Sequence, residues 1–88
     1  MKVIHKYPLE KQFTRLTLHE DFKVLCAHTQ NDVCTLWIEV DIDKPAQEGY
    51  FRIVGTGGAV PNLAHYVGTC FIDALVWHVY HVQQREWT

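Results

Sequence analysis

Serine is absent from this chain of 88 residues, which removes the residue most often used as a hydroxyl nucleophile. The chain also lacks a large excess of either charge, because ten acidic and eight basic residues give a net charge near −2. This balance excludes a protein that binds nucleic acid mainly by electrostatic attraction, and it excludes an acidic DNA mimic. No apolar run reaches 18 residues and no signal peptide is evident, so the sequence predicts a soluble cytoplasmic protein.

Cysteine is scarce, and the three that occur are an odd number: Cys26, Cys34 and Cys70. In a reducing cytoplasm free thiols are the rule, whereas small secreted domains carry paired cysteines. The sequence therefore predicts three free thiols that behave as small buried apolar side chains. A structural disulfide is the less favoured alternative.

What the chain has is the composition of a single globular domain, spanning residues 1–88. Hydrophobic residues make up 48% and charged residues 20%, which is far from the composition of disordered chains. A chain of this length buries roughly 60–65% of its unfolded surface, so its stability margin is thin. No repeat or internal boundary divides it.

Alternation of apolar and polar residues predicts strands over residues 2–7, 13–18, 22–29, 33–42 and 50–54. The clearest alternation places one apolar set on a core face: Cys34, Leu36, Ile38, Val40 and Ile42. Its opposite face carries Trp37 and three carboxylates, Glu39, Asp41 and Asp43. The loop Gln30–Asp32 predicts a hairpin that pairs this strand with the one before it.

The second half of the chain is less regular. Residues 44–49 read as a loop, three glycines interrupt regular structure at positions 55–58, and residues 61–66 predict one short helical turn. Residues 69–82 are apolar on both faces, which fits a central strand, a strand at a subunit interface or a buried helix. Their β-branched and aromatic side chains favour a strand, and residues 83–88 form a polar tail.

These elements predict a mainly β fold: a small antiparallel meander or barrel of five to seven strands with at most one short helix. The two-faced segment 69–82 also predicts self-association, because one small sheet cannot cover both of its faces.

Four ordered fragments resemble a known family. They are His5–Glu10, Leu36–Trp37 with Val40–Asp41, Arg52–Gly57, and Tyr66–Thr69 followed by Leu75–Tyr80. Together they resemble a family of small proteins common in tailed-phage and prophage genomes. The resemblance implies a small β-rich phage accessory protein acting in the host cytoplasm, and it carries no functional residue over to this chain. The family's glycine-rich stretch before the last strand is replaced here by Phe71–Ala74.

Metal ligands and nucleophiles are present but poorly arranged. Zinc could draw on Cys26, His28, Cys34, Cys70, His78 and His81, yet there is no C-x-x-C pair. On a strand, His78 and His81 point to opposite faces. The acids Glu39 and Asp41 share a face about 7 Å apart, which indicates a solvated surface rather than a catalytic pair. The sequence thus predicts no enzyme, no metal and no cofactor.

The residues most suggestive of binding are a glycine-rich loop and nearby aromatics. Backbone amides of Gly55, Thr56, Gly57 and Gly58 could converge on an anion, with Arg52 just upstream. The indoles of Trp37 and Trp77 could stack on a base. A structural turn is the competing interpretation of the loop.

Three functions follow as hypotheses. The first is a homo-oligomeric phage protein that acts against host defence by sequestering a nucleotide-like immune signal. The second is an inhibitor of a host defence protein such as a CRISPR nuclease, meeting a basic surface with Trp37 and the acidic face of its strand. The third is a structural phage component. No membrane and no direct nucleic-acid contact is expected in any of them.

Overall fold

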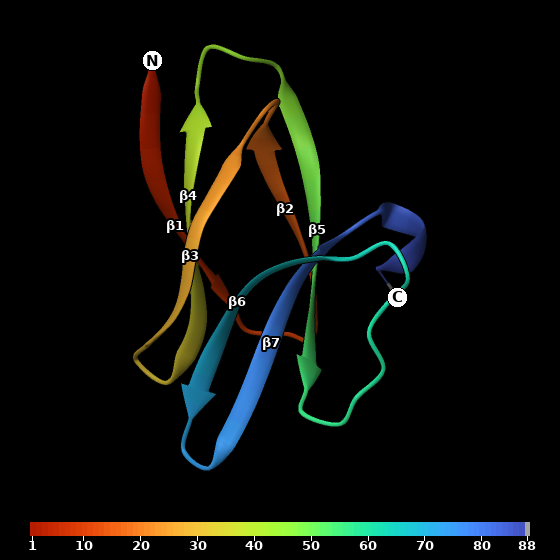
Figure 1. Ribbon diagram of the computed structural model, residues 1–88. Helices are drawn as coiled ribbons and strands as arrows, with labels where there is room; N and C mark the ends of the chain where they lie inside the picture. Colours follow the sequence, from red (N-terminus) through yellow and green to blue (C-terminus); the bar gives the residue numbers. More distant parts are fainter. Residues whose placement is uncertain (88) are drawn as a thin grey trace.

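The computed structural model describes residues 1–87, and they form seven strands in two antiparallel sheets (Figure 1). The strands are β1 (Lys2–Leu9), β2 (Phe13–His19), β3 (Lys23–Gln30), β4 (Val33–Asp41), β5 (Ala46–Gly55), β6 (His65–Ile72) and β7 (Leu75–Val82). A 3-10 turn, η1 (Gln84–Glu86), follows β7. The prediction of a mainly β fold with five to seven strands is confirmed. Within residues 1–87 no helix is long and apolar enough to cross a membrane.

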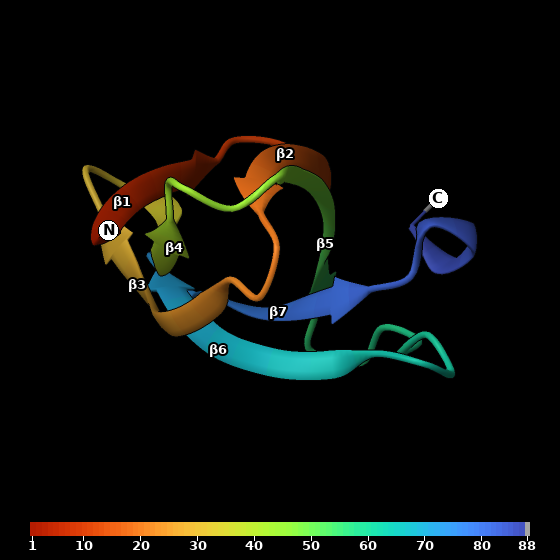
Figure 2. The same cartoon turned by 90° about the horizontal axis from the view of Figure 1, so that it is seen from above.

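Sheet A has the order β1-β4-β3, and sheet B has the order β2-β5-β7-β6. Seen from above, the two sheets curve around a shared interior (Figure 2). At one corner β3 and β6 approach so closely that a Cβ on Gly68 would lie 2.5 Å from that of Ala27. Beside this contact the Thr29 hydroxyl donates to the Phe71 carbonyl at 2.8 Å. The sandwich is therefore nearly closed along this edge.

The core fills the space between the sheets with the inward residues of the central strands. Sheet A contributes Leu36, Ile38 and Val40, and sheet B contributes Phe51 and Val79, all of them at most 1% exposed. Such burial follows from strand alternation, which sends every second side chain inward. The alternation predicted for β4 is confirmed at Leu36, Ile38 and Val40. It fails near the start of the strand, where Thr35 is only 2% exposed, and at its end, where Ile42 lies in the following turn and is 40% exposed.

A disulfide between Cys34 and Cys70 joins β4 of sheet A to β6 of sheet B, with Cα atoms 5.6 Å apart. The prediction of three free thiols is therefore wrong for this pair. It is also wrong about the burial of Cys26, which is free but exposed. A bulge between Val24 and Cys26 shifts the register of β3, so that Cys26 pairs with Trp37 on the outer face of sheet A.

Four further boundaries differ from the sequence prediction. Residues 69–82 form a hairpin rather than one strand, because the chain reverses at Asp73, whose φ of 54° is left-handed. The predicted helical turn over residues 61–66 is wrong, since His65 and Tyr66 already pair with β7. The predicted loop over residues 44–49 is mostly the first half of β5. Pro8 does not end β1, because an edge strand tolerates the missing donor.

Candidate ligand-binding cleft

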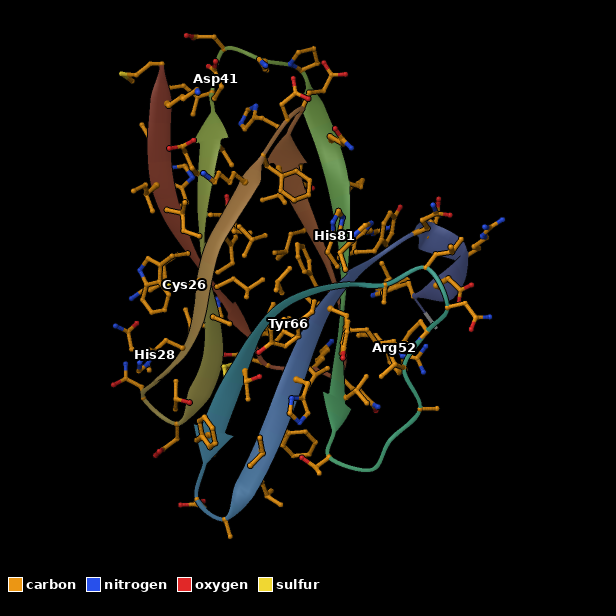
Figure 3. The ribbon with its side chains drawn as sticks, viewed as in Figure 1. Cys26, His28, Asp41, Arg52, Tyr66 and His81 are labelled. Carbon is orange, nitrogen blue, oxygen red and sulfur yellow. A yellow bond between two sulfur atoms is a disulfide. The ribbon has the colours of Figure 1, made fainter. Side chains whose placement is uncertain are left out.

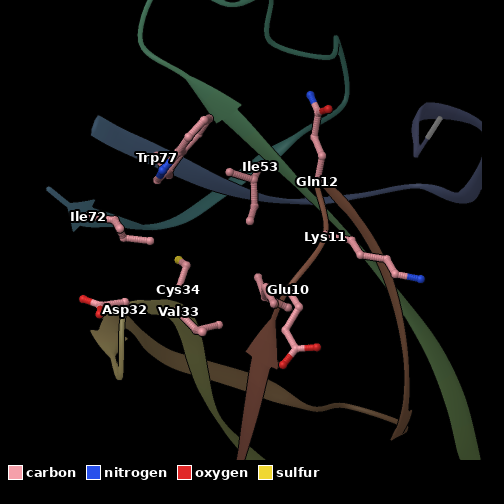
Figure 4. A pocket seen from close by; sticks show the side chains of 10 residues that line it. Glu10, Lys11, Gln12, Asp32, Val33, Cys34, Ile53, Ile72 and Trp77 are labelled. Atoms are coloured by element: carbon pink, nitrogen blue, oxygen red, sulfur yellow. The ribbon is translucent and has the colours of Figure 1, made fainter. Parts of the chain in front are cut away.

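A cleft of about 540 Å³ opens between the two sheets at the end where β1 passes into β2 (Figure 4). Its apolar wall is contributed by both sheets: Leu9, Val33 and Cys34 from sheet A, and Ile53, Ile72 and Trp77 from sheet B. Its polar rim consists of Glu10, Lys11, Gln12 and Asp32. A concave apolar site with a few polar groups is the usual form of a small-molecule pocket, and pockets often lie at the mouths of β-barrels.

Trp77 supplies the largest flat surface of the cleft. It pairs with Gly55 across β5 and β7, and a Cβ on Gly55 would lie 3.2 Å from the indole. The glycine therefore leaves the ring room to lie against the strand. Because Trp77 is only partly buried, part of the indole is available for stacking on a planar ligand.

The β1–β2 connection holds the rim in place. The carbonyl of Gln12 accepts a hydrogen bond from the amide of Ile53 at 2.9 Å, and the Thr14 hydroxyl donates to the carbonyl of Lys11 at 3.3 Å. On the opposite side Asp32 sits at the β3–β4 turn with a left-handed φ of 61°. Backbone contacts thus fix one cation, two carboxylates and one amide around the opening.

The seven residues predicted to bind a ligand do not meet at one site. Trp77 lines the cleft, whereas Arg52 lies on the outer face of sheet B and Trp37 on the outer face of sheet A. The loop Gly55–Gly58 crosses the outer side of sheet B, where the amide of Gly58 donates to the carbonyl of Gly55 at 2.9 Å. The loop therefore has the geometry of a structural turn, which was the competing interpretation of these glycines.

Thr56 belongs to a hydrogen-bonded group that the sequence did not reveal. Its hydroxyl lies 3.0 Å from Nε2 of His78, and the Thr69 hydroxyl lies 3.3 Å from Nδ1 of the same ring. The phenol of Tyr66 contacts the Thr69 hydroxyl. The group joins three segments that are remote in sequence, so no local spacing could have predicted it. It ties the glycine loop to the outer face of sheet B.

His81 lies on the inner side of β7, opposite to His78, as the strand alternation predicted. Its ring stacks on Phe51 at 5.2 Å between centroids and meets the edge of Phe22 at 5.2 Å. Burial among these rings, and secondarily the nearby His65, lowers the pKa of His81 below its ordinary value of 6.5. His81 therefore favours the neutral form.

The metal ligands considered from sequence are dispersed. Cys34 and Cys70 are bonded to each other and cannot act as thiolates. Cys26 and His28 lie on β3, remote from His81 (Figure 3). Among residues 1–87 no group of three or more histidine, cysteine or acidic side chains is placed to hold a metal ion.

The acidic face predicted around Trp37 is partly neutralised. The Met1 ammonium donates to Asp41 at 3.0 Å and also contacts Asp43. The hydrogen bond from the Met1 ammonium to Asp41, followed by the one from the Asp43 backbone amide, lowers the pKa of Asp41. Lys23 of β3 is the cross-strand partner of Glu39. This arrangement weakens the charge argument for a basic protein partner.

The fold and the cleft together define a small all-β protein with an open cleft between two sheets. The chain belongs to a family described as a domain of unknown function (DUF7352), whose model matches residues 1–88. No curated protein and no solved structure matches the chain.

Proposed function

We propose that the protein is a non-catalytic binding protein that sequesters a nucleotide-like small molecule in the cleft beside Trp77. The observation that carries this proposal is the combination of a part-exposed indole and a polar rim around about 540 Å³ of space. That volume lies in the range of known small-molecule pockets, roughly 300–1,000 Å³.

The chemistry of the cleft fits the parts of a nucleotide. A base is planar and would stack on Trp77, while its polar edge would meet the Gln12 amide and the Asp32 carboxylate. The phosphate would lie toward the Lys11 ammonium. Lys11 takes part in none of the ion pairs within residues 1–87. The neighbouring Glu10 disfavours a ligand with several negative charges. We therefore expect one phosphate group rather than a long polyphosphate.

The biological setting rests on the resemblance to small phage proteins. A phage protein that removes a nucleotide signal in the host would blunt a defence system without needing catalysis. A homo-oligomer would hold several copies of the signal. The absence of a serine nucleophile and the structural role of Thr56 both fit a binding protein.

The proposal is tested by making the same substitution at two tryptophans, one inside the cleft and one outside it. Trp77→Leu keeps an apolar side chain in the cleft and removes the stacking surface, whereas Trp37→Leu makes the same change on the outer face of sheet A. Stacking of a base on an aromatic side chain contributes about 1–3 kcal/mol, so Trp77→Leu should weaken binding by roughly 5- to 150-fold. Calorimetric titration with nucleoside monophosphates and cyclic dinucleotides measures this. Equal affinity in the two variants would exclude the cleft.

A second candidate uses the outer face of sheet A as a protein-binding surface. Trp37 lies there, partly buried, on the same face as Ile4 and Cys26. Ile4 is 58% exposed, and aromatic side chains are frequent anchors of interfaces. For a protein inhibitor of a defence effector, Trp37→Leu would abolish capture of the effector and Trp77→Leu would not.

A further inference from the structure

The C-terminal turn crosses the outer face of sheet B and covers Arg52. Nη1 of Arg52 donates to the carbonyl of Glu86 at 3.2 Å, and the guanidinium carbon lies 5.2 Å from the centre of the Phe13 ring. The indole of Trp87 packs on Tyr50, with 5.5 Å between ring centroids. The guanidinium thus contacts the Phe13 ring and the Glu86 carbonyl at the same time.

Two hydrogen-bond donors in this cluster lack an acceptor. Within residues 1–87, Nε of Arg52 and Nε1 of Trp87 are both buried and unpartnered. Among the described residues, 1–87, Arg52 also takes part in no ion pair, whereas Arg15 on the same face pairs with Glu48 at 3.7 Å. A buried donor without an acceptor is unfavourable, and so is a half-buried cation without a counter-charge. One oxyanion would supply both the missing hydrogen-bond acceptor and the missing counter-charge.

We propose that this cluster, comprising Arg52, Tyr50, Phe13 and Trp87, is an oxyanion site that the C-terminal turn masks. A carboxylate or phosphate group would accept hydrogen bonds from Nε and one Nη of the guanidinium, whose planar geometry suits two oxygens of one group. The indole N–H supplies a third donor. Because the free donors are buried, the turn must lift for the anion to enter. This site lies on the outer face of sheet B, and none of its four residues lines the cleft beside Trp77.

The first test uses the wild-type full chain and follows the side-chain N–H signals of arginine and tryptophan by NMR. Inorganic phosphate is titrated in one arm and acetate in the other, at constant ionic strength. We expect the Arg52 and Trp87 signals to move on one saturation curve in at least one arm, and the tighter arm identifies the ligand class. The proposal is overturned if neither signal moves, or if the Arg15 signal moves as much as that of Arg52.

The second test loosens the turn without removing either donor. Tyr50→Thr removes the ring on which Trp87 packs and keeps a residue that favours strands. Apparent affinity falls in proportion to the fraction of open molecules, so opening the turn should strengthen anion binding by roughly tenfold. Arg52→Gln should abolish binding, and Arg15→Gln is the matched control that retains it. Binding that survives Arg52→Gln, or that Tyr50→Thr does not strengthen, overturns the proposal. If the Tyr50→Thr variant does not fold, the NMR titration of the wild-type protein still tests whether the cluster binds an anion.

Discussion

Reduction of the disulfide between Cys34 and Cys70 should destabilise the protein more than any single conservative change on its surface. The bridge is the one disulfide in residues 1–87, it ties β4 of sheet A to β6 of sheet B, and its cysteines are 36 positions apart. Closing a loop of that length removes about 4 kcal/mol of conformational free energy from the unfolded chain. Domains of this size are stable by only about 5–15 kcal/mol, so this loss is a large fraction of the total.

The assay is urea unfolding of the oxidised and the reduced protein, monitored by tryptophan fluorescence. We expect the free energy of unfolding to fall by about 3–4 kcal/mol on reduction, and each kcal/mol lowers the melting temperature of such a domain by about 4–8 °C. Cys26→Ser is the matched control, because this exposed thiol forms no bridge. Alkylation of the freshly isolated protein should modify Cys26 alone. Coincident unfolding curves for the oxidised and reduced protein would refute the reasoning.

Three further outcomes follow from the packing. Gly68→Ala should cost about 1–3 kcal/mol in urea unfolding, because the new Cβ would collide with Ala27 across β3 and β6; unchanged stability would disprove the close approach. Phe51→Ala should cost about 3–5 kcal/mol, since it empties the centre of the core, and a loss below about 1 kcal/mol would place this ring outside it. The folded-state pKa of His81 is lowered, so the unfolded chain binds more protons below the ordinary value of 6.5. Stability should therefore decline as the pH falls below about 6.5, and His81→Gln should remove this part of the decline.

The sequence predicted the parts of the fold that local alternation specifies. The pairing of β3 with β4 follows from two alternating segments around a short turn, and the burial of Leu36, Ile38 and Val40 follows from a period of two. The β6–β7 hairpin was missed because its turn uses Asp73 in a left-handed conformation rather than an Asn-Gly or Asp-Gly pair. Asp73 is followed by Ala74, which signals no turn by itself.

The remaining differences depend on contacts between distant residues. The bulge in β3 exposes Cys26, and no glycine or proline in the sequence signals this bulge. The pairing of Cys34 with Cys70 requires the two sheets to face each other, which no spacing of three cysteines can specify. Of the residues proposed for binding, Trp77 alone lines the cleft, because the inward or outward direction of a side chain on a two-sided apolar strand depends on which sheet covers it.

Native mass spectrometry of protein purified from its host cells tests the central claim most directly. We expect a defined oligomer that retains a small molecule of nucleotide mass. That molecule should be lost from Trp77→Leu and kept by Trp37→Leu. Two results would contradict a binding function for the cleft. One is a wild-type protein that neither retains a nucleotide nor binds one when it is added, and the other is equal retention in both variants.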